Sequence, residues 1–104
     1  MKREPLRQEI KHRLAAAFGP RLRGVVLYGS EARGDATDDS DIDLLVLLDG
    51  PLSVGADLRA IINALYDLQL QIGRPIHAMP GEYNEYEAAE LFLYQEVRRE
   101  GLWL

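Results

Sequence analysis

The segment from Asp41 to Leu48, which reads DIDLLVLL, constrains the fold more than any other part of this chain. Its last five residues are all apolar, and a strand without polar positions must be covered on both of its faces. The segment therefore predicts a central strand that lies between two layers of packed elements. Asp49, Gly50 and Pro51 follow directly and are expected to end the strand.

Hydrophobic spacing predicts the remaining elements. Leu6, Ile10, Leu14 and Phe18 recur every four residues, as on the buried face of a helix. The 104 residues fit one domain, so we expect residues 1–104 to form a single α/β (α+β) domain with a small mixed sheet. In chain order the predicted elements are a helix from Leu6 to Phe18, a strand Gly24–Tyr28, a helical turn over residues 31–34, the strand Asp41–Leu48, a helix from Val54 to near Gly73, an edge strand Pro75–Met79 and a last helix Glu85–Arg99.

The negative charge of the chain is concentrated in one short segment. Lys and Arg number 12 against 17 Asp and Glu, which gives a net charge of -5, and residues 35–43 contain five aspartates and no basic residue. Carboxylates this close repel one another and weaken the fold unless something offsets the repulsion. A solvated loop and a bound divalent cation are the two possibilities, and composition alone favours the first.

Composition also excludes several classes of function. The chain has no cysteine, so disulfide scaffolds, cysteine-ligated zinc sites and cysteine nucleophiles are ruled out, and a cytoplasmic protein is expected. No hydrophobic run exceeds five residues, whereas a membrane span needs about 20, so we expect no membrane partner. Because basic residues are scattered over an acidic chain, no strong direct binding of nucleic acid is expected.

The residues that flank the acidic segment favour the bound cation. Side chains alternate across a strand, so Asp41 and Asp43 face the same way where the central strand begins. Two such carboxylates can share Mg²⁺, and their mutual repulsion should raise the pKa of one of them in the metal-free chain. Gly29 and Ser30 follow the predicted strand 24–28, where a backbone turn and a hydroxyl can hold phosphate oxygens. If the two strands are adjacent, a phosphate cradle lies beside a metal pair, as phosphoryl or nucleotidyl transfer requires.

Residues 25–48, VVLYGSEARGDATDDSDIDLLVLL, resemble the G-S-x(9–13)-D-x-D signature of the polymerase-β-like nucleotidyltransferases, and most of all the minimal nucleotidyltransferase subgroup. The resemblance implies a small mixed sheet with helices packed on it. It also implies that Gly29 and Ser30 bind the phosphates of a nucleoside triphosphate and that Asp41 and Asp43 bind Mg²⁺. Minimal members are commonly antitoxins paired with an all-helical HEPN ribonuclease, and some of them adenylylate a tyrosine of that partner.

One family feature is absent from its usual place. Active members carry a third carboxylate on a later strand, and the matching strand here, PIHAM, has only His77 as a titratable group. His77 is therefore the candidate base, and Glu82 and Glu85 could reach the site only if their loop folds back. Arg33 is expected either to bind phosphate or to pair with the acidic loop.

Two functions remain open at this point. The first is Mg²⁺-dependent transfer of a nucleoside monophosphate, AMP from ATP, to a hydroxyl of a partner protein. The second is a non-catalytic or weakly catalytic module that neutralises a HEPN ribonuclease by docking. In either case Leu91, Phe92, Tyr94 and Trp103 are expected to form an apolar surface that contacts the partner or a second copy in a homo-oligomer.

Overall fold

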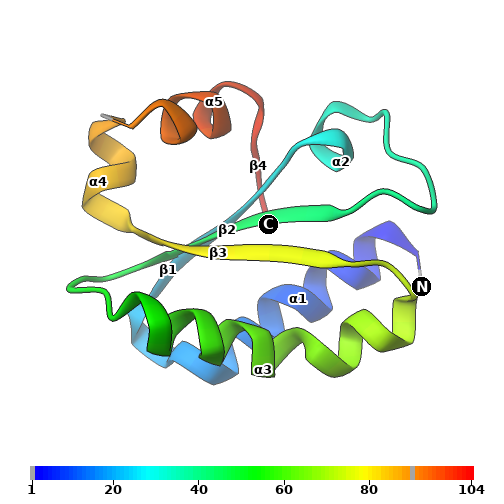
Figure 1. Ribbon diagram of the computed structural model, residues 1–104, viewed down its shortest axis with the longest axis horizontal. Helices are drawn as coiled ribbons and strands as arrows, with labels where there is room; N and C mark the ends of the chain where they lie inside the picture. Colours follow the sequence, from blue (N-terminus) through cyan, green and yellow to red (C-terminus); the bar gives the residue numbers. More distant parts are fainter. Residues whose placement is uncertain (1, 90) are drawn as a thin grey trace.

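A computed structural model describes residues 2–89 and 91–104, and its centre is a sheet with the strand order β3-β2-β1-β4 (Figure 1). The mixed α/β class predicted above is confirmed. In chain order the described elements are α1 (Arg3–Phe18), the 3-10 helix η1 (Gly19–Arg21), β1 (Leu22–Tyr28), α2 (Ser30–Arg33), β2 (Ile42–Leu48), α3 (Val54–Ile72), β3 (Ile76–Glu82), α4 (Tyr83–Ala88), α5 (Phe92–Glu100) and β4 (Leu102–Trp103).

The apolar segment forms the interior strand β2, as predicted. It pairs antiparallel with β1 on one side and parallel with β3 on the other, and Leu44 to Leu48 are all buried. The strand β3 lies at the edge of the sheet, and Pro75 stands just before it. The edge position is as predicted from Pro75, since proline has no N–H to donate to a ladder. The strand begins one residue later than predicted and continues through Pro80 to Glu82.

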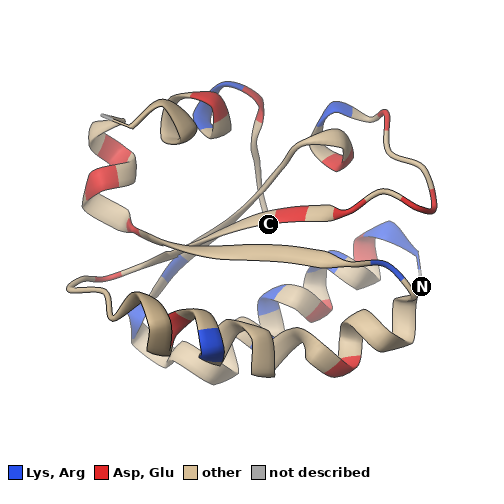
Figure 2. Cartoon of the chain, viewed as in Figure 1, with Lys and Arg blue, Asp and Glu red and all other residues tan. Residues whose placement is uncertain are grey.

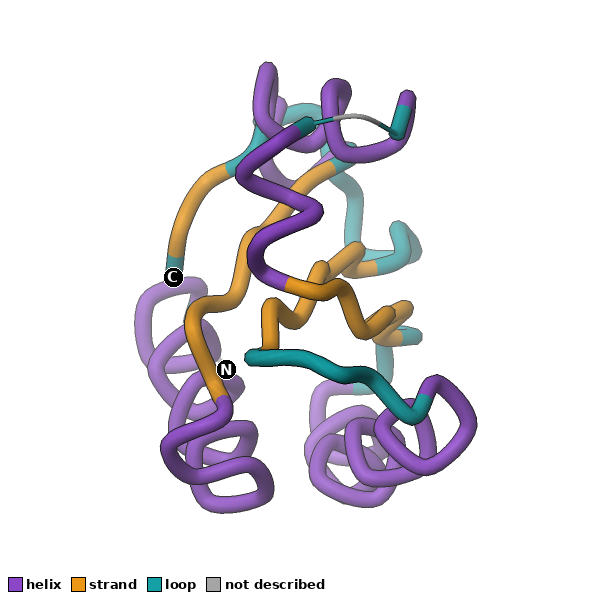
Figure 3. Tube along the Cα trace, turned by 90° about the vertical axis from the view of Figure 1, so that its left-hand side faces the viewer, coloured by secondary structure: helices purple, strands orange, loops and turns teal. Residues whose placement is uncertain are grey.

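Two layers of helices cover the two faces of the sheet (Figure 3). Leu44, Val46 and Leu48 pack in one cluster with buried residues of α1 and α3. Leu45 and Leu47 point to the opposite face and pack with residues of α4 and α5. The period of two along β2 therefore divides the core into two parts, and it also decides the face on which Asp43 lies.

The prediction of one long last helix is wrong. The chain instead forms α4 and α5. The helix α4 ends at Ala88, and the next residue, Ala89, has a left-handed φ of 54° that is incompatible with a continuing helix. The break turns Tyr86 and Tyr94 toward each other, with ring centroids 5.7 Å apart in an edge-to-face pair. Tyr94 is consequently buried at 7% exposure, so its predicted place on the exposed apolar surface is also wrong.

The short strand β4 was not predicted. Its two residues pair antiparallel with Val26 and Leu27 of β1 and close the other edge of the sheet. Trp103 lies so close to Gly24 that a Cβ at position 24 would overlap the indole ring. In the described part of the chain, no helix combines the length and the apolar character needed to cross a membrane.

Candidate active site

The turn at Gly29 brings β1 and β2 into close contact at one end of the sheet. Gly29 has a φ of 73°, which is left-handed, and a Cβ there would collide with Oδ2 of Asp43. Glycine is therefore required twice, for the backbone conformation and for the close approach of a carboxylate. The turn leads directly into α2, whose first residue is Ser30.

The two aspartates lie beside this turn, as the spacing predicted. Asp43 is opposite Tyr28 of β1 and opposite His77 of β3 in the strand register. Asp41 stands one residue before β2, and its Oδ2 lies 3.5 Å from Nδ1 of His77. The structure thus brings Gly29, Ser30, Asp41, Asp43 and His77 to one end of the sheet.

The pKa of Asp43 is raised above its ordinary value, as expected for one member of the pair. Partial burial of the carboxylate is the largest cause, whereas the predicted repulsion by Asp41 is a smaller one and Glu100 adds to it. His77 and Arg33 act in the opposite direction but do not cancel the shift. The site therefore holds negative charge that the described side chains leave uncompensated, and a divalent cation would compensate it.

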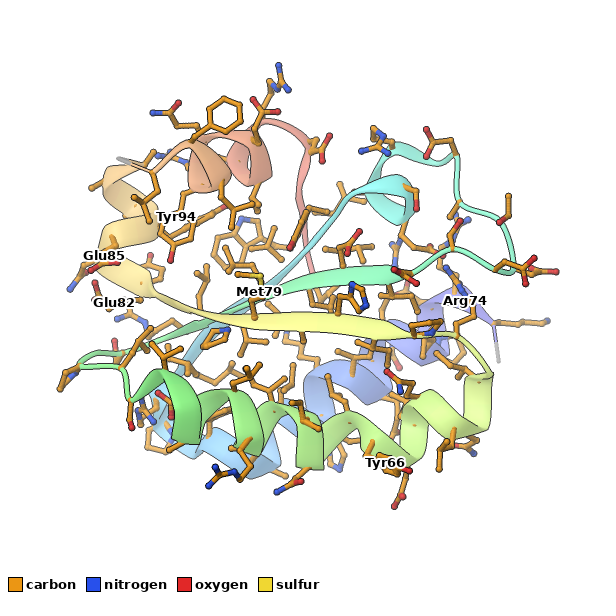
Figure 4. The ribbon with its side chains drawn as sticks, in the orientation of Figure 1. Tyr66, Arg74, Met79, Glu82, Glu85 and Tyr94 are labelled. Atoms are coloured by element: carbon orange, nitrogen blue, oxygen red, sulfur yellow. The ribbon has the colours of Figure 1, made fainter. Side chains whose placement is uncertain are left out.

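The acidic loop before Asp41 is held in place by hydrogen bonds. The Thr37 N–H donates to Oγ of Ser40 at 2.8 Å, and Nε of Arg74 donates to the Ser40 carbonyl at 3.0 Å. The same Arg74 guanidinium pairs with Glu31 of α2. Figure 2 shows acidic residues along this loop and at the start of β2, and Figure 4 labels Arg74 at the same end of the sheet. Arg74 thus joins α2, the loop and the start of β3.

A third carboxylate reaches the site from α5, where the sequence did not indicate one. Oε1 of Glu100 accepts a hydrogen bond from the Gly29 N–H at 3.2 Å, and Oε2 lies 3.4 Å from Nη1 of Arg33. Arg33 also pairs with Asp35 of the acidic loop at 3.4 Å. A single continuous last helix gave no reason to place residue 100 at the Gly29 turn, so no local sequence signal could have found it.

Glu82 and Glu85 are far from this end of the sheet. Glu82 pairs with Leu48 at the other end of β2, and its carboxylate caps α4 by accepting from the N–H groups of Asn84 and Glu85 (Figure 4). The five-residue separation of His77 and Glu82 along β3 spans roughly 17 Å at 3.3 Å per strand residue. The possibility that Glu82 or Glu85 acts as a base is therefore wrong.

The donor set fits a hard cation that also binds substrate. Asp41 and Asp43 offer carboxylate oxygens, and Mg²⁺ commonly takes one or two carboxylates together with substrate phosphates. In the described residues no three His, Cys, Asp or Glu side chains form a ready-made metal site, so substrate oxygens would complete the coordination. A cavity of about 220 Å³ lies next to this end of the sheet. Its lining includes Glu31, Asp38, Ile42 and Arg74 but none of Gly29, Ser30, Asp41 and Asp43.

Comparison with known proteins identifies the family of the chain. The family described as "Nucleotidyltransferase domain" matches residues 7–103. The protein MJ0604 of Methanocaldococcus jannaschii, named as a candidate protein adenylyltransferase, is 33% identical over 92 residues, which are 88% of this chain and 80% of that protein.

Solved structures show the same fold. A chain of a toxin–antitoxin crystallised with AMP-PNP superposes with a TM-score of 0.69 at 23% identity, over 93% of this chain and 70% of that one. A candidate nucleotidyltransferase of Sulfolobus solfataricus gives 0.67 at 23% identity, over 95% and 76%. A mutant of the MntA-HpeT toxin–antitoxin gives 0.62 at 24% identity, over 93% and 70%. With a family match over nearly its whole length and a relative above 30% identity, the chain belongs to the nucleotidyltransferase domain family and is a nucleotidyltransferase.

Proposed function

We propose that this nucleotidyltransferase moves AMP from ATP, in a Mg²⁺-dependent reaction, to a hydroxyl group of a partner protein. The observation that carries the proposal is the contact between the Gly29 turn and Asp43, with Asp41 beside them. The name of the MJ0604 relative supports adenylyl transfer to protein, and the crystallisation of one structural neighbour with AMP-PNP supports an adenine nucleotide.

The residues of the site divide into two groups. Asp41 and Asp43 would hold Mg²⁺, and the Gly29 N–H, the Ser30 hydroxyl and Arg33 would bind the phosphates. When bound, the cation neutralises charge on the phosphates and on the leaving pyrophosphate. The raised pKa of Asp43 supports this role. A carboxylate whose negative charge is poorly stabilised by its surroundings is stabilised most when a cation binds to it.

In the reaction the acceptor oxygen forms a bond to the α-phosphorus of ATP as the bond to the bridging oxygen of pyrophosphate breaks. The hydroxyl proton must leave the acceptor, and we assign His77 as the group that takes it. The His77 side chain is 65% exposed and lies 3.5 Å from Asp41, so a protein acceptor can reach it beside the aspartates. A general base of this kind typically contributes about 10²–10⁴-fold to the rate.

The partner we propose is an all-helical HEPN-type toxin, with this chain acting as a cytoplasmic antitoxin. Two structural neighbours are chains of toxin–antitoxin pairs, which supports a partner of this class. Exposed apolar side chains at the start of α5 and on β4 offer a docking surface, since Phe92 is 74% and Trp103 is 53% exposed.

A labelled-nucleotide assay tests the function. The chain is incubated with Mg²⁺, ATP labelled on the α-phosphate and the product of the neighbouring gene as the candidate toxin, and label is sought on that product. We expect Asp41→Asn and Asp43→Asn to abolish labelling, and Asp38→Asn, which makes the same charge change in the exposed loop, to retain it. Neutralisation of the toxin without any transfer of label would contradict adenylyl transfer to this partner and favour neutralisation by docking instead.

A further inference from the structure

Glu100 lies where a phosphate group would compete with it. Its carboxylate accepts from the Gly29 N–H at 3.2 Å and lies 3.4 Å from Nη1 of Arg33. Both donors belong to the group that we assign to the phosphates of the nucleotide. A carboxylate and a phosphate are anionic acceptors of similar reach, so one set of donors cannot serve both fully at once.

We infer that Glu100 occupies the phosphate-binding donors of the free chain as an internal anion, and that an incoming triphosphate must displace it. The inference rests on the proposed function, because it takes the Gly29 turn to be the phosphate cradle. Its consequence is that Glu100 sets the affinity for nucleotide: it lowers the affinity of a chain that would otherwise bind triphosphate more tightly.

The position of Glu100 is fixed by packing. Glu100 is the last residue of α5, and the next residue, Gly101, lies so close to β1 that a Cβ there would collide with Cγ1 of Val26 and the Val97 carbonyl. Val97, one turn earlier, is fully buried. The end of α5 is therefore anchored on β1, and only the side chain of Glu100 has to rotate when it gives up its donors.

The charge balance of the site also favours displacement. Glu100 adds a third carboxylate to Asp41 and Asp43 at the place where a polyanion would bind, and Arg33 is the cation that it contacts. Its side chain is 24% exposed, so the carboxylate already borders solvent, and it gains hydration when it turns outward. Two anions that share the donors of one guanidinium and one amide repel each other, so the weaker competitor leaves.

Glu100→Gln separates charge from shape. Glutamine keeps an oxygen that can accept from the Gly29 N–H but removes the negative charge. Glu96→Gln is the matched control, because Glu96 is on the same helix and pairs with Arg99 away from the turn. We would measure dissociation constants by calorimetry for Mg²⁺-ATP and for Mg²⁺-tripolyphosphate, which has the phosphates but no nucleoside.

We expect Glu100→Gln to tighten both ligands by about three- to tenfold, as loss of one partly screened like charge predicts, and Glu96→Gln to change them less than twofold. Glu100→Ala should tighten them at least as much. Unchanged or weaker binding by both Glu100 variants, with the wild type binding normally, would overturn this inference alone and make Glu100 a support of the turn. If neither the wild type nor any variant binds either ligand, the phosphate cradle itself is wrong, and the proposed function fails with the inference.

Discussion

At the scale of single residues, the site depends on the contact between Gly29 and Asp43. Gly29 and Gly34 both have left-handed φ values, of 73° and 83°, but a side chain at Gly34 would meet open space. The ψ values differ, with -153° at Gly29 and 11° at Gly34. An alanine at position 34 takes up the αL conformation at a cost of roughly 1 kcal/mol, whereas position 29 has a backbone conformation that is essentially restricted to glycine, and a side chain there also collides with a carboxylate.

We therefore expect Gly29→Ala to destabilise the chain more than Gly34→Ala and to abolish nucleotide binding, which Gly34→Ala should retain. Urea unfolding and a nucleotide titration of both variants check this. Equal losses of stability together with full nucleotide binding by Gly29→Ala would show that the close approach to Asp43 has no role.

Asp43 should make the stability of the metal-free chain depend on pH. Its folded pKa is raised from 3.8, so the folded state binds the proton more readily than the unfolded state. The stability that this proton contributes is complete below 3.8 and is lost as the pH rises through the raised folded pKa.

Asp43→Asn removes this loss, so the variant should gain stability relative to the wild type as the pH rises from about 3 to about 7 in EDTA. Asp38→Asn, in the exposed loop, should show no such trend. The free energy of unfolding as a function of pH gives the answer. A difference between wild type and Asp43→Asn that does not vary with pH would contradict the assignment.

At the scale of elements, the Arg74 side chain connects α2, the acidic loop and the start of β3. Its guanidinium pairs with Glu31 of α2 and donates to the Ser40 carbonyl, and the Arg74 and Glu31 side chains are only 18% and 12% exposed. Removing one partner of a fully buried pair costs about 3–5 kcal/mol, and the partial exposure of this pair lowers the expected cost to or below the low end of that range.

Arg74→Ala should lower the free energy of unfolding by about 2–3 kcal/mol and weaken Mg²⁺-ATP binding, because the loop that positions Asp41 loses its support. Arg59→Ala, on the exposed face of α3, is the control and should change neither quantity. Chemical unfolding and calorimetry measure both effects. Full nucleotide affinity in Arg74→Ala would show that the loop holds its shape unaided.

The elements also show how far sequence reasoning reaches. The central strand, the flanking helices and the convergence of Gly29 with Asp43 follow from local periodicity and motif spacing, and the structure has them. The break at Ala89, the strand β4 and the arrival of Glu100 at the turn depend on long-range packing of Tyr86, Tyr94 and Trp103. Helical spacing alone cannot reveal a break that tertiary contacts impose.

At the scale of the whole molecule, apolar side chains are exposed at the start of α5 and on β4. The surface consists of Leu91, Phe92, Leu102 and Trp103, which are 55%, 74%, 42% and 53% exposed. Large apolar side chains this exposed suggest that a macromolecular partner covers them.

Phe92→Ser should weaken binding of the toxin by at least about tenfold, since a buried aromatic anchor is worth roughly 2 kcal/mol. Leu70→Ser is the control, because Leu70 is 63% exposed on α3, on the other face of the sheet. Light scattering and an affinity titration distinguish a partner from a second copy. If the chain is a monomer and Phe92→Ser leaves its affinity for the toxin unchanged, this surface is not an interface.

Thermal unfolding with and without ligands is the sharpest test of whether Asp41, Asp43 and the Gly29 turn form one Mg²⁺-dependent nucleotide site. At a ligand concentration of about 100 times the dissociation constant, Mg²⁺ and ATP together should stabilise the wild type by about 2.7 kcal/mol, and ATP with EDTA should do so far less. Asp41→Asn and Asp43→Asn should lose this response, and Asp38→Asn should keep it. These residues do not form such a site if Mg²⁺-ATP leaves the melting temperature of the wild type unchanged. The same conclusion follows if Mg²⁺-ATP stabilises Asp43→Asn as much as it stabilises the wild type.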